Sequence, residues 1–78
     1  MSAKPTLATL REQQYFDILA LAEKAGVNPL AVDRMLRRQP VQLYQAELVL
    51  TALSDELSQD YTLETVDIVL APEKGKES

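Results

Sequence analysis

The stretch DILALAEKAGVNPLAVDRMLRR, residues 17–38, carries the start and stop signals of two short helices. Asp17 has the side chain of a helix N-cap, and the apolar residues after it repeat at the spacing of one helical face. Gly26 predicts the end of this helix, because glycine enters the left-handed conformation without a side-chain penalty. The apolar face consists of Ile18, Leu21, Ala22 and Ala25.

A second helix is predicted over residues 29–38. Asn28 is a strong N-cap, and Pro29 suits the first helical position because its missing N–H costs nothing there. Pro40 disfavours helical geometry at Gln39 and so separates this helix from the next. The two helices are therefore joined by a short turn over 26–28.

Helices are also expected on both sides of this pair. Pro5 or Thr6 opens one that continues to about Gln14. The longest helical pattern, over 41–57, has two apolar stripes. They are Leu43, Ala46, Val49 or Leu50, Leu53 and Leu57 on one face, and Val41, Tyr44, Leu48 and Ala52 on the neighbouring face. The second stripe belongs either to the core or to a self-association surface.

The segment YTLETVDIVLA, residues 61–71, fits both a helix and a strand. We expect a helical turn over 62–67, capped by Thr62, and then an extended segment over 68–71. An exposed apolar edge would need a partner, so this segment is a second candidate surface for dimerisation. Its apolar residues are Ile68, Val69 and Leu70.

The expected fold is therefore all-α, a bundle of four to five short helices followed by a short extended C-terminal segment. A chain of this length makes a single domain, 1–78, and must use nearly all of its apolar residues as core. The ordered part is expected over about 5–71, with flexible ends at 1–4 and 72–78.

Composition excludes several functional classes. The 78 residues contain neither cysteine nor histidine, which removes disulfides, Cys/His zinc sites, thiol nucleophiles and imidazole bases. We therefore expect no enzyme and no cofactor. No apolar run is long enough to span a bilayer, and the N-terminus lacks the apolar core of a signal peptide, so a soluble, cytoplasmic protein is expected.

Charge is distributed unevenly. The formal net charge is −4, but residues 28–46 carry a net charge of +2 and residues 47–78 one of −6. The only net-positive segment thus coincides with the second predicted helix, so a polyanionic partner is compatible with the negative total.

The run LREQQYFDILALAEKAGVNPLAVDRMLRRQPVQLYQAELVLTAL, residues 10–53, resembles the helix-turn-helix domain of lambda-repressor-like regulators of the XRE type. The resemblance rests on the spacing of Ala22, Gly26 and Val32, which supply a close helix crossing, a turn and a buried wedge. Val27 and Met35 complete that wedge. The resemblance covers more than half of the chain and implies a lambda-repressor-like bundle whose second motif helix enters the major groove of DNA.

Carried over by position, the resemblance implies a set of DNA-contacting residues. The base-facing candidates are Asn28, Pro29, Leu30, Asp33 and Arg34, and the phosphate-facing candidates are Lys24, Arg37 and Arg38. Family members often have glutamine, serine or threonine at positions 29–31 and glutamine at position 18, where this chain has apolar residues. Direct reading is left to Arg34 on guanine, to Asn28, and to contact of Leu30 or Ala31 with thymine methyl groups, so modest specificity is expected.

Each of these residues also has a purely structural interpretation. Arg37 and Arg38 complement the dipole of a helix C-terminus, and Asp33 can pair with Arg37 four residues later. Capping alone explains Asn28 and Pro29.

The resulting hypothesis is a sequence-specific transcriptional regulator that binds double-stranded DNA as a homodimer. The alternative is a protein-interaction module, or an antitoxin-like subunit, that keeps the helical scaffold and binds DNA weakly or not at all. The apolar positions 29–31 and the acidic C-terminal region favour this alternative. The two hypotheses differ in whether the basic side chains of the second helix face solvent unobstructed.

Overall fold

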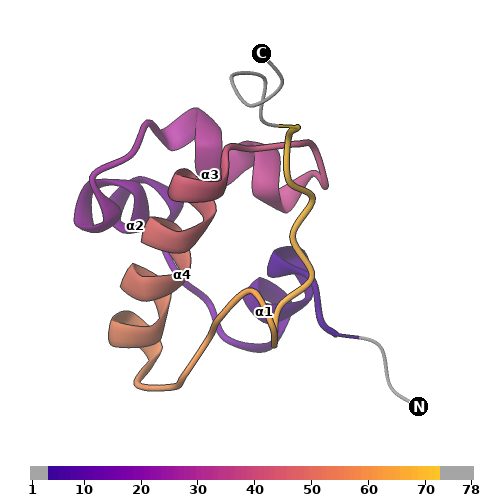
Figure 1. Ribbon diagram of the computed structural model, residues 1–78. Coiled ribbons are helices and arrows are strands. Elements are labelled where there is room, and N and C mark those ends of the chain that lie inside the picture. Colours follow the sequence, from indigo (N-terminus) through magenta and orange to yellow (C-terminus); the bar gives the residue numbers. More distant parts are fainter. Residues whose placement is uncertain (1–3, 73–78) are drawn as a thin grey trace.

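The computed structural model describes residues 4–72, and within them the chain forms four helices (Figure 1). They are α1 (Leu7–Gln13), α2 (Ile18–Ala25), α3 (Pro29–Leu36) and α4 (Leu43–Leu57). The predicted all-α class is confirmed. The predictions made for residues 1–3 and 73–78 lie outside the described residues.

The first three helices begin at the predicted caps. Thr6 Oγ1 accepts the Thr9 N–H at 3.1 Å, and Asp17 caps α2 in the same way through its carboxylate. Asn28 Oδ1 accepts the Leu30 N–H at 2.9 Å at the start of α3. Gly26 ends α2 in the left-handed conformation, with φ of 75°. These boundaries therefore follow from side chains that satisfy the unpaired backbone groups of their own helix.

The predicted end of α3 is wrong by two residues. The helix stops at Leu36, and Arg38 adopts the left-handed conformation with φ of 61°. The Gln39 N–H then bonds back to the Arg34 carbonyl at 2.8 Å, which closes the helix end as glycine usually does. Arg38 therefore lies beyond the helix, and its side chain does not continue the pattern of α3.

The predicted start of α4 is also two residues too early. Val41 does not belong to the helix, because its backbone is bonded to the C-terminal part of the chain: its N–H donates to Val69 O at 3.2 Å and its carbonyl accepts the Ala71 N–H at 2.8 Å. Gln45 Oε1 accepts the Gln42 N–H at 3.3 Å at the true start of the helix.

Residues 62–66 form a single hydrogen-bonded turn and not a fifth helix. Thr62 caps it as predicted: its hydroxyl accepts the Glu64 N–H at 3.2 Å and its carbonyl accepts the Val66 N–H at 2.9 Å. The chain then runs extended over residues 67–71, which we call the C-terminal strap. The strap forms two isolated parallel bridges, Thr6 with Asp67 and Val41 with Leu70.

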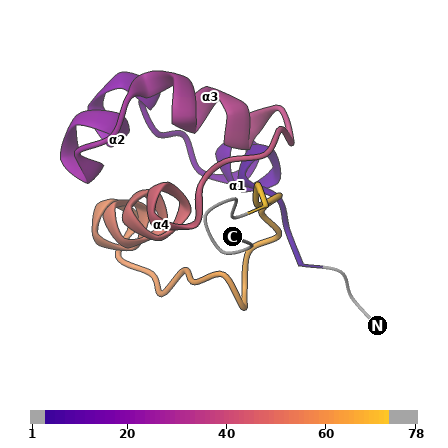
Figure 2. The same ribbon diagram turned by 45° about the horizontal axis from the view of Figure 1, so that its top comes forward.

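The core lies between all of these elements (Figure 2). α2 packs against both α3 and α4, and α1 packs against α3, while the strap passes beside the start of α1. Ala22, Val32 and Met35 are buried at the α2–α3 crossing, and Val27 is half-buried beside them, as the wedge interpretation predicts. The fully buried larger side chains are Leu7, Val32, Val41, Val49, Leu50, Leu53 and Val66.

The second apolar stripe of α4 divides between core and surface. Val41 and Ala52 are buried within the chain, whereas the side chains of Tyr44 and Leu48 remain exposed. Ala52 is thus removed from the first candidate dimer surface, because its side chain is buried in the core.

Candidate nucleic-acid interface

α3 has one buried and one outward side. Ala31, Val32 and Met35 point into the core. The outward side consists of Asn28, Pro29, Leu30, Asp33, Arg34 and Arg37, of which only Asp33 is half-buried. Six of the eight predicted site residues therefore lie together on one surface, because a rotation of about 100° per residue separates them from the core positions. Ala31 is excluded as a reader of thymine methyl groups by its burial.

Most polar groups on this outward side are already engaged. Asn28 spends its side-chain oxygen on the cap of α3, which leaves its amide N–H groups. Asp33 and Arg37 form an ion pair at 3.1 Å, one helical turn apart. Arg34 is exposed and forms no ion pair with any residue in the described part of the chain. It is therefore the most available hydrogen-bond donor on this surface.

Lys24 is not brought to this surface. Its ammonium lies 2.6 Å from Asp55 and 3.6 Å from Glu56, both near the C-terminal end of α4. The hydrogen bond from Lys24 lowers the pKa of Asp55, and the same hydrogen bond raises the pKa of Lys24. Lys24 thus joins α2 to α4, on the flank of α2 that faces away from α3.

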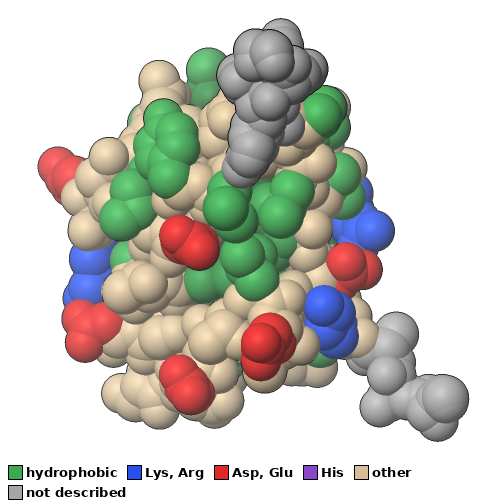
Figure 3. Space-filling model, in the orientation of Figure 1, with side chains coloured by type: hydrophobic (Ala, Val, Ile, Leu, Met, Phe, Trp, Pro, Cys, Tyr) green, Lys and Arg blue, Asp and Glu red, His purple; other side chains and the backbone are tan. Residues whose placement is uncertain are grey.

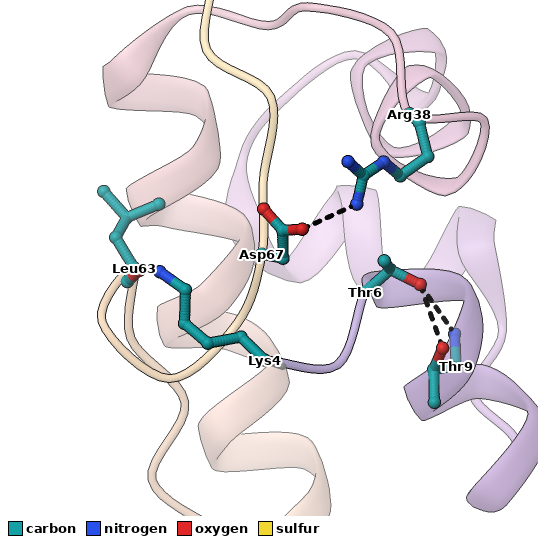
Figure 4. A network of polar contacts seen from close by, with 6 residues as sticks. All are labelled: Lys4, Thr6, Thr9, Arg38, Leu63 and Asp67. Atoms are coloured by element: carbon teal, nitrogen blue, oxygen red, sulfur yellow. Dashed lines mark hydrogen bonds and ion pairs between the residues drawn. The ribbon is translucent and has the colours of Figure 1, made fainter. Parts of the chain in front are cut away.

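Arg38 is also drawn away from α3. Its Nη1 donates to Asp67 Oδ2 at 2.9 Å, which ties the residue after the helix end to the C-terminal strap (Figure 4). In the same region Lys4 Nζ donates to the Leu63 carbonyl at 3.2 Å. Two of the three basic side chains expected to face phosphates, Lys24 and Arg38, therefore hold distant parts of the fold together.

An apolar elbow lies where α2 meets α3. A shallow hollow there is lined by Leu19, Glu23, Val27 and Pro29. Leu30, the next residue of α3, has 61% of its surface exposed. Leu19 is 65% exposed and was missed as a site residue. The signal was present in the sequence, since Leu19 is a large apolar residue off the buried stripe of its helix.

Arg11 and Tyr15 were also missed. They lie at the end of α1 and after it, and together with Leu36 of α3 they line a second hollow. Nothing in the spacing of the sequence marks this contact, because it depends on how α1 packs against α3.

The opposite candidate surface lies over α4 and the strap. In Figure 3 apolar side chains gather in the middle of this face, with acidic side chains around them. Tyr44, Leu48 and Leu70 are its exposed large apolar residues, while Ile68 and Val69 are half-buried. One edge of the strap is already paired with Val41, so its backbone is less available to a second subunit than the sequence suggests.

None of the helices within residues 4–72 has the length and apolarity required to cross a bilayer. No protein-family model matches the chain, and no match is found among curated proteins or solved structures.

Proposed function

We propose that this protein is a lambda-repressor-like, DNA-binding transcriptional regulator that places the outward side of α3 in the major groove. The observation that carries the proposal is the convergence of six predicted contact residues on one exposed surface, with Arg34 unpaired among the described residues. The three-residue connection between α2 and α3, with buried Ala22 and Val32 and left-handed Gly26, supports the helix-turn-helix interpretation. A cytoplasmic location belongs to the same proposal.

The charge arrangement favours weak binding to DNA. Arg34 and Arg37 are the two cations on the outward side, and the pair between Arg37 and Asp33 is a surface ion pair that a phosphate can replace, worth about 0.3–0.5 kcal/mol. Arg34 can meet a phosphate in place of a guanine edge, and two phosphate contacts then predict a slope of log affinity against log salt of about −1.8. Affinity should then fall about tenfold between 50 and 200 mM salt.

Homodimerisation is the second part of the proposal. One such module buries only about 600–1,000 Å² on DNA, so two copies on half-sites about one helical turn apart would supply the missing affinity. The exposed Tyr44 and Leu48 on α4 support a self-association surface away from α3. Sedimentation of wild type and Leu48→Glu tests it: we expect a dimer that the substitution dissociates, and a monomer at all concentrations would contradict it.

Fluorescence anisotropy with mixed-sequence duplexes at low salt tests DNA binding. We expect the Arg34→Ala, Arg37→Ala double variant to lose most of the affinity and Lys24→Ala to retain it. Lys24→Ala is the control for the loss of a positive charge away from α3, because the Lys24 side chain faces α4. Equal binding by all three proteins, or no binding by wild type, would refute the assignment.

A second candidate function is favoured by the apolar elbow. Leu19 and Leu30 are exposed beside a hollow, and Lys24 and Arg38 are neutralised by carboxylates of the same chain. A protein partner could bury these leucines, as in an antitoxin-like subunit. A stoichiometric partner that is retained by wild type and by Leu48→Asp, but lost with Leu30→Asp, would support this function; retention by Leu30→Asp would exclude it at this surface.

A further inference from the structure

Arg11 is held in place by two neighbouring aromatic residues. Its guanidinium carbon lies 5.1 Å from the centroid of the Tyr15 ring and 6.0 Å from that of Phe16. Its Nε donates to the Phe16 carbonyl at 3.2 Å. Since a guanidinium has five N–H donors in a rigid fork, this arrangement orients the group and leaves its two terminal nitrogens available.

The two aromatic residues beside Arg11 differ in their exposure to solvent. Phe16 is buried and belongs to the core, but 74% of the Tyr15 surface faces solvent. Arg11 forms no ion pair with any residue in the described range. Glu12 lines the same hollow and opposes anion binding there without contacting the guanidinium at ion-pair distance. The Arg11–Tyr15 stack is thus an oriented cation on an exposed aromatic surface.

The stack lies against one flank of α3. Ala8, Arg11, Glu12 and Tyr15 line their hollow together with Leu36, the last residue of α3. At about 100° per residue, Leu36 lies on the edge of α3 that Pro29 and Asp33 share, next to the outward side. A helix about 10–12 Å in diameter fills a major groove about 12 Å wide, so a phosphate backbone passes along each flank.

We propose that the Arg11 guanidinium, oriented by Tyr15, binds a backbone phosphate of duplex DNA beside the C-terminal end of α3. This inference rests on the proposed function and adds to it a third phosphate contact, on α1. The contact is independent of base sequence, since phosphate contacts position a protein on DNA and base contacts specify the site. Three contacts, with Arg34 and Arg37, predict a salt slope of about −2.7 in place of −1.8.

The test is the salt dependence of affinity for full-length wild type and Arg11→Gln, measured on several unrelated duplexes. For the variant, the slope of log affinity against log salt should be shallower by about 0.9. The ratio of wild-type to variant affinity should therefore change about 3.5-fold between 50 and 200 mM salt. The change should be the same on every duplex. Arg11→Lys should keep the slope, because it keeps the charge, and Tyr15→Phe should keep both slope and affinity, because it keeps the ring.

Lys24→Gln is the matched control and should leave the slope unchanged. Thermal unfolding of each variant distinguishes the phosphate contact from a merely structural role of Arg11. If the role is structural, Arg11→Gln lowers the melting temperature and leaves the salt slope at the wild-type value. That result, or a loss confined to one duplex sequence, would overturn the phosphate contact while leaving DNA binding intact. Absence of DNA binding by wild type would instead overturn the proposed function, and this inference with it.

Discussion

The α2–α3 pair and the C-terminal strap are stabilised in opposite ways. α2 begins after Asp17 and ends at Gly26, and α3 begins after Asn28; the bonds of these three residues reach only a few positions along the chain. The strap and the turn before it are held by residues far away in sequence: Lys4 reaches Leu63 across 59 positions, and Arg38 reaches Asp67 across 29. Local signals thus build the candidate binding surface, and long-range contacts close the fold around it.

The same difference divides the basic side chains. Lys24 and Arg38 pair with carboxylates of α4 and of the strap, so their charges serve the fold. Within residues 4–72, Arg37 pairs only with Asp33, one helical turn earlier. A cluster of arginines in a sequence is therefore an incomplete guide to a nucleic-acid surface, because an acidic segment elsewhere in the chain can neutralise part of it.

The largest expected effect tests the long-range side of this comparison. Val66 is fully buried just before the strap, so Val66→Ala removes two buried methyl groups and leaves a cavity. We expect the free energy of unfolding to fall by about 2–3 kcal/mol. Chemical denaturation measures it, with Val69→Ala as the control at a half-buried position, expected to cost less than about 1 kcal/mol. A loss at Val66 as small as that expected at Val69 would mean that the region before the strap is not anchored in the core.

A smaller effect tests the local side. Gly26 has φ of 75°, and a Cβ added there would meet no atom within 4 Å. Gly26→Ala should therefore lower the free energy of unfolding by about 1 kcal/mol through backbone strain alone. Gly26→Asn should cost less, because asparagine tolerates this conformation. Denaturation curves of the two variants compare them, and a loss well above about 2 kcal/mol for alanine would point to a steric clash instead.

Substitutions at Arg38 test the contact between the end of α3 and the C-terminal strap. Its left-handed backbone costs about 1 kcal/mol relative to glycine, while its partly exposed ion pair with Asp67 contributes about 0–1 kcal/mol. Arg38→Gly removes both the strain and the ion pair and should unfold at nearly the wild-type denaturant concentration. Arg38→Ala removes only the ion pair and should be the less stable of the two. An alanine variant more stable than the glycine variant would show that the left-handed backbone at this position is not strained.

The smallest expected effect is the pH dependence from Lys24 and Asp55. The pKa of Asp55 is lowered from 3.8, so its stabilising contribution is present above that value and is lost as pH falls through the lowered pKa. The pKa of Lys24 is raised from 10.5, so its contribution is present below that value and is lost as pH rises through the raised pKa. In a plot of the free energy of unfolding against pH, Lys24→Met should reduce the loss of stability at both low and high pH. Arg34→Met should leave the plot as in wild type.

Much of the fold could be predicted from the sequence, and the two misplaced helix boundaries have different causes. The starts of the first three helices, the turn at Gly26 and the cap at Thr62 depend on side chains that bond to their own segment. The end of α3 was misplaced because Arg38 adopts the left-handed conformation usually taken by glycine, which lets the Gln39 N–H bond back to the Arg34 carbonyl. The start of α4 was misplaced because the backbone of Val41 is bonded to the distant strap. Propensity and periodicity contain no information about that contact.

The candidate site divides in the same way. The resemblance carried Leu30, Arg34 and Arg37 over as contact candidates, and all three lie on the side of α3 opposite the core, because each residue rotates the helix by a constant angle. Only tertiary packing decided that Lys24 faces α4, that Arg38 faces Asp67, and that Arg11 and Tyr15 lie beside Leu36.

The sequence by itself thus determined the helices, their caps and the side of α3 that stays in solvent, since these depend on bonds within a few residues. The tertiary structure decided which charges are neutralised and which remain available. Charge pairing depends on distances in space, and those distances are set by the packing of α4 and the strap against the first half of the chain.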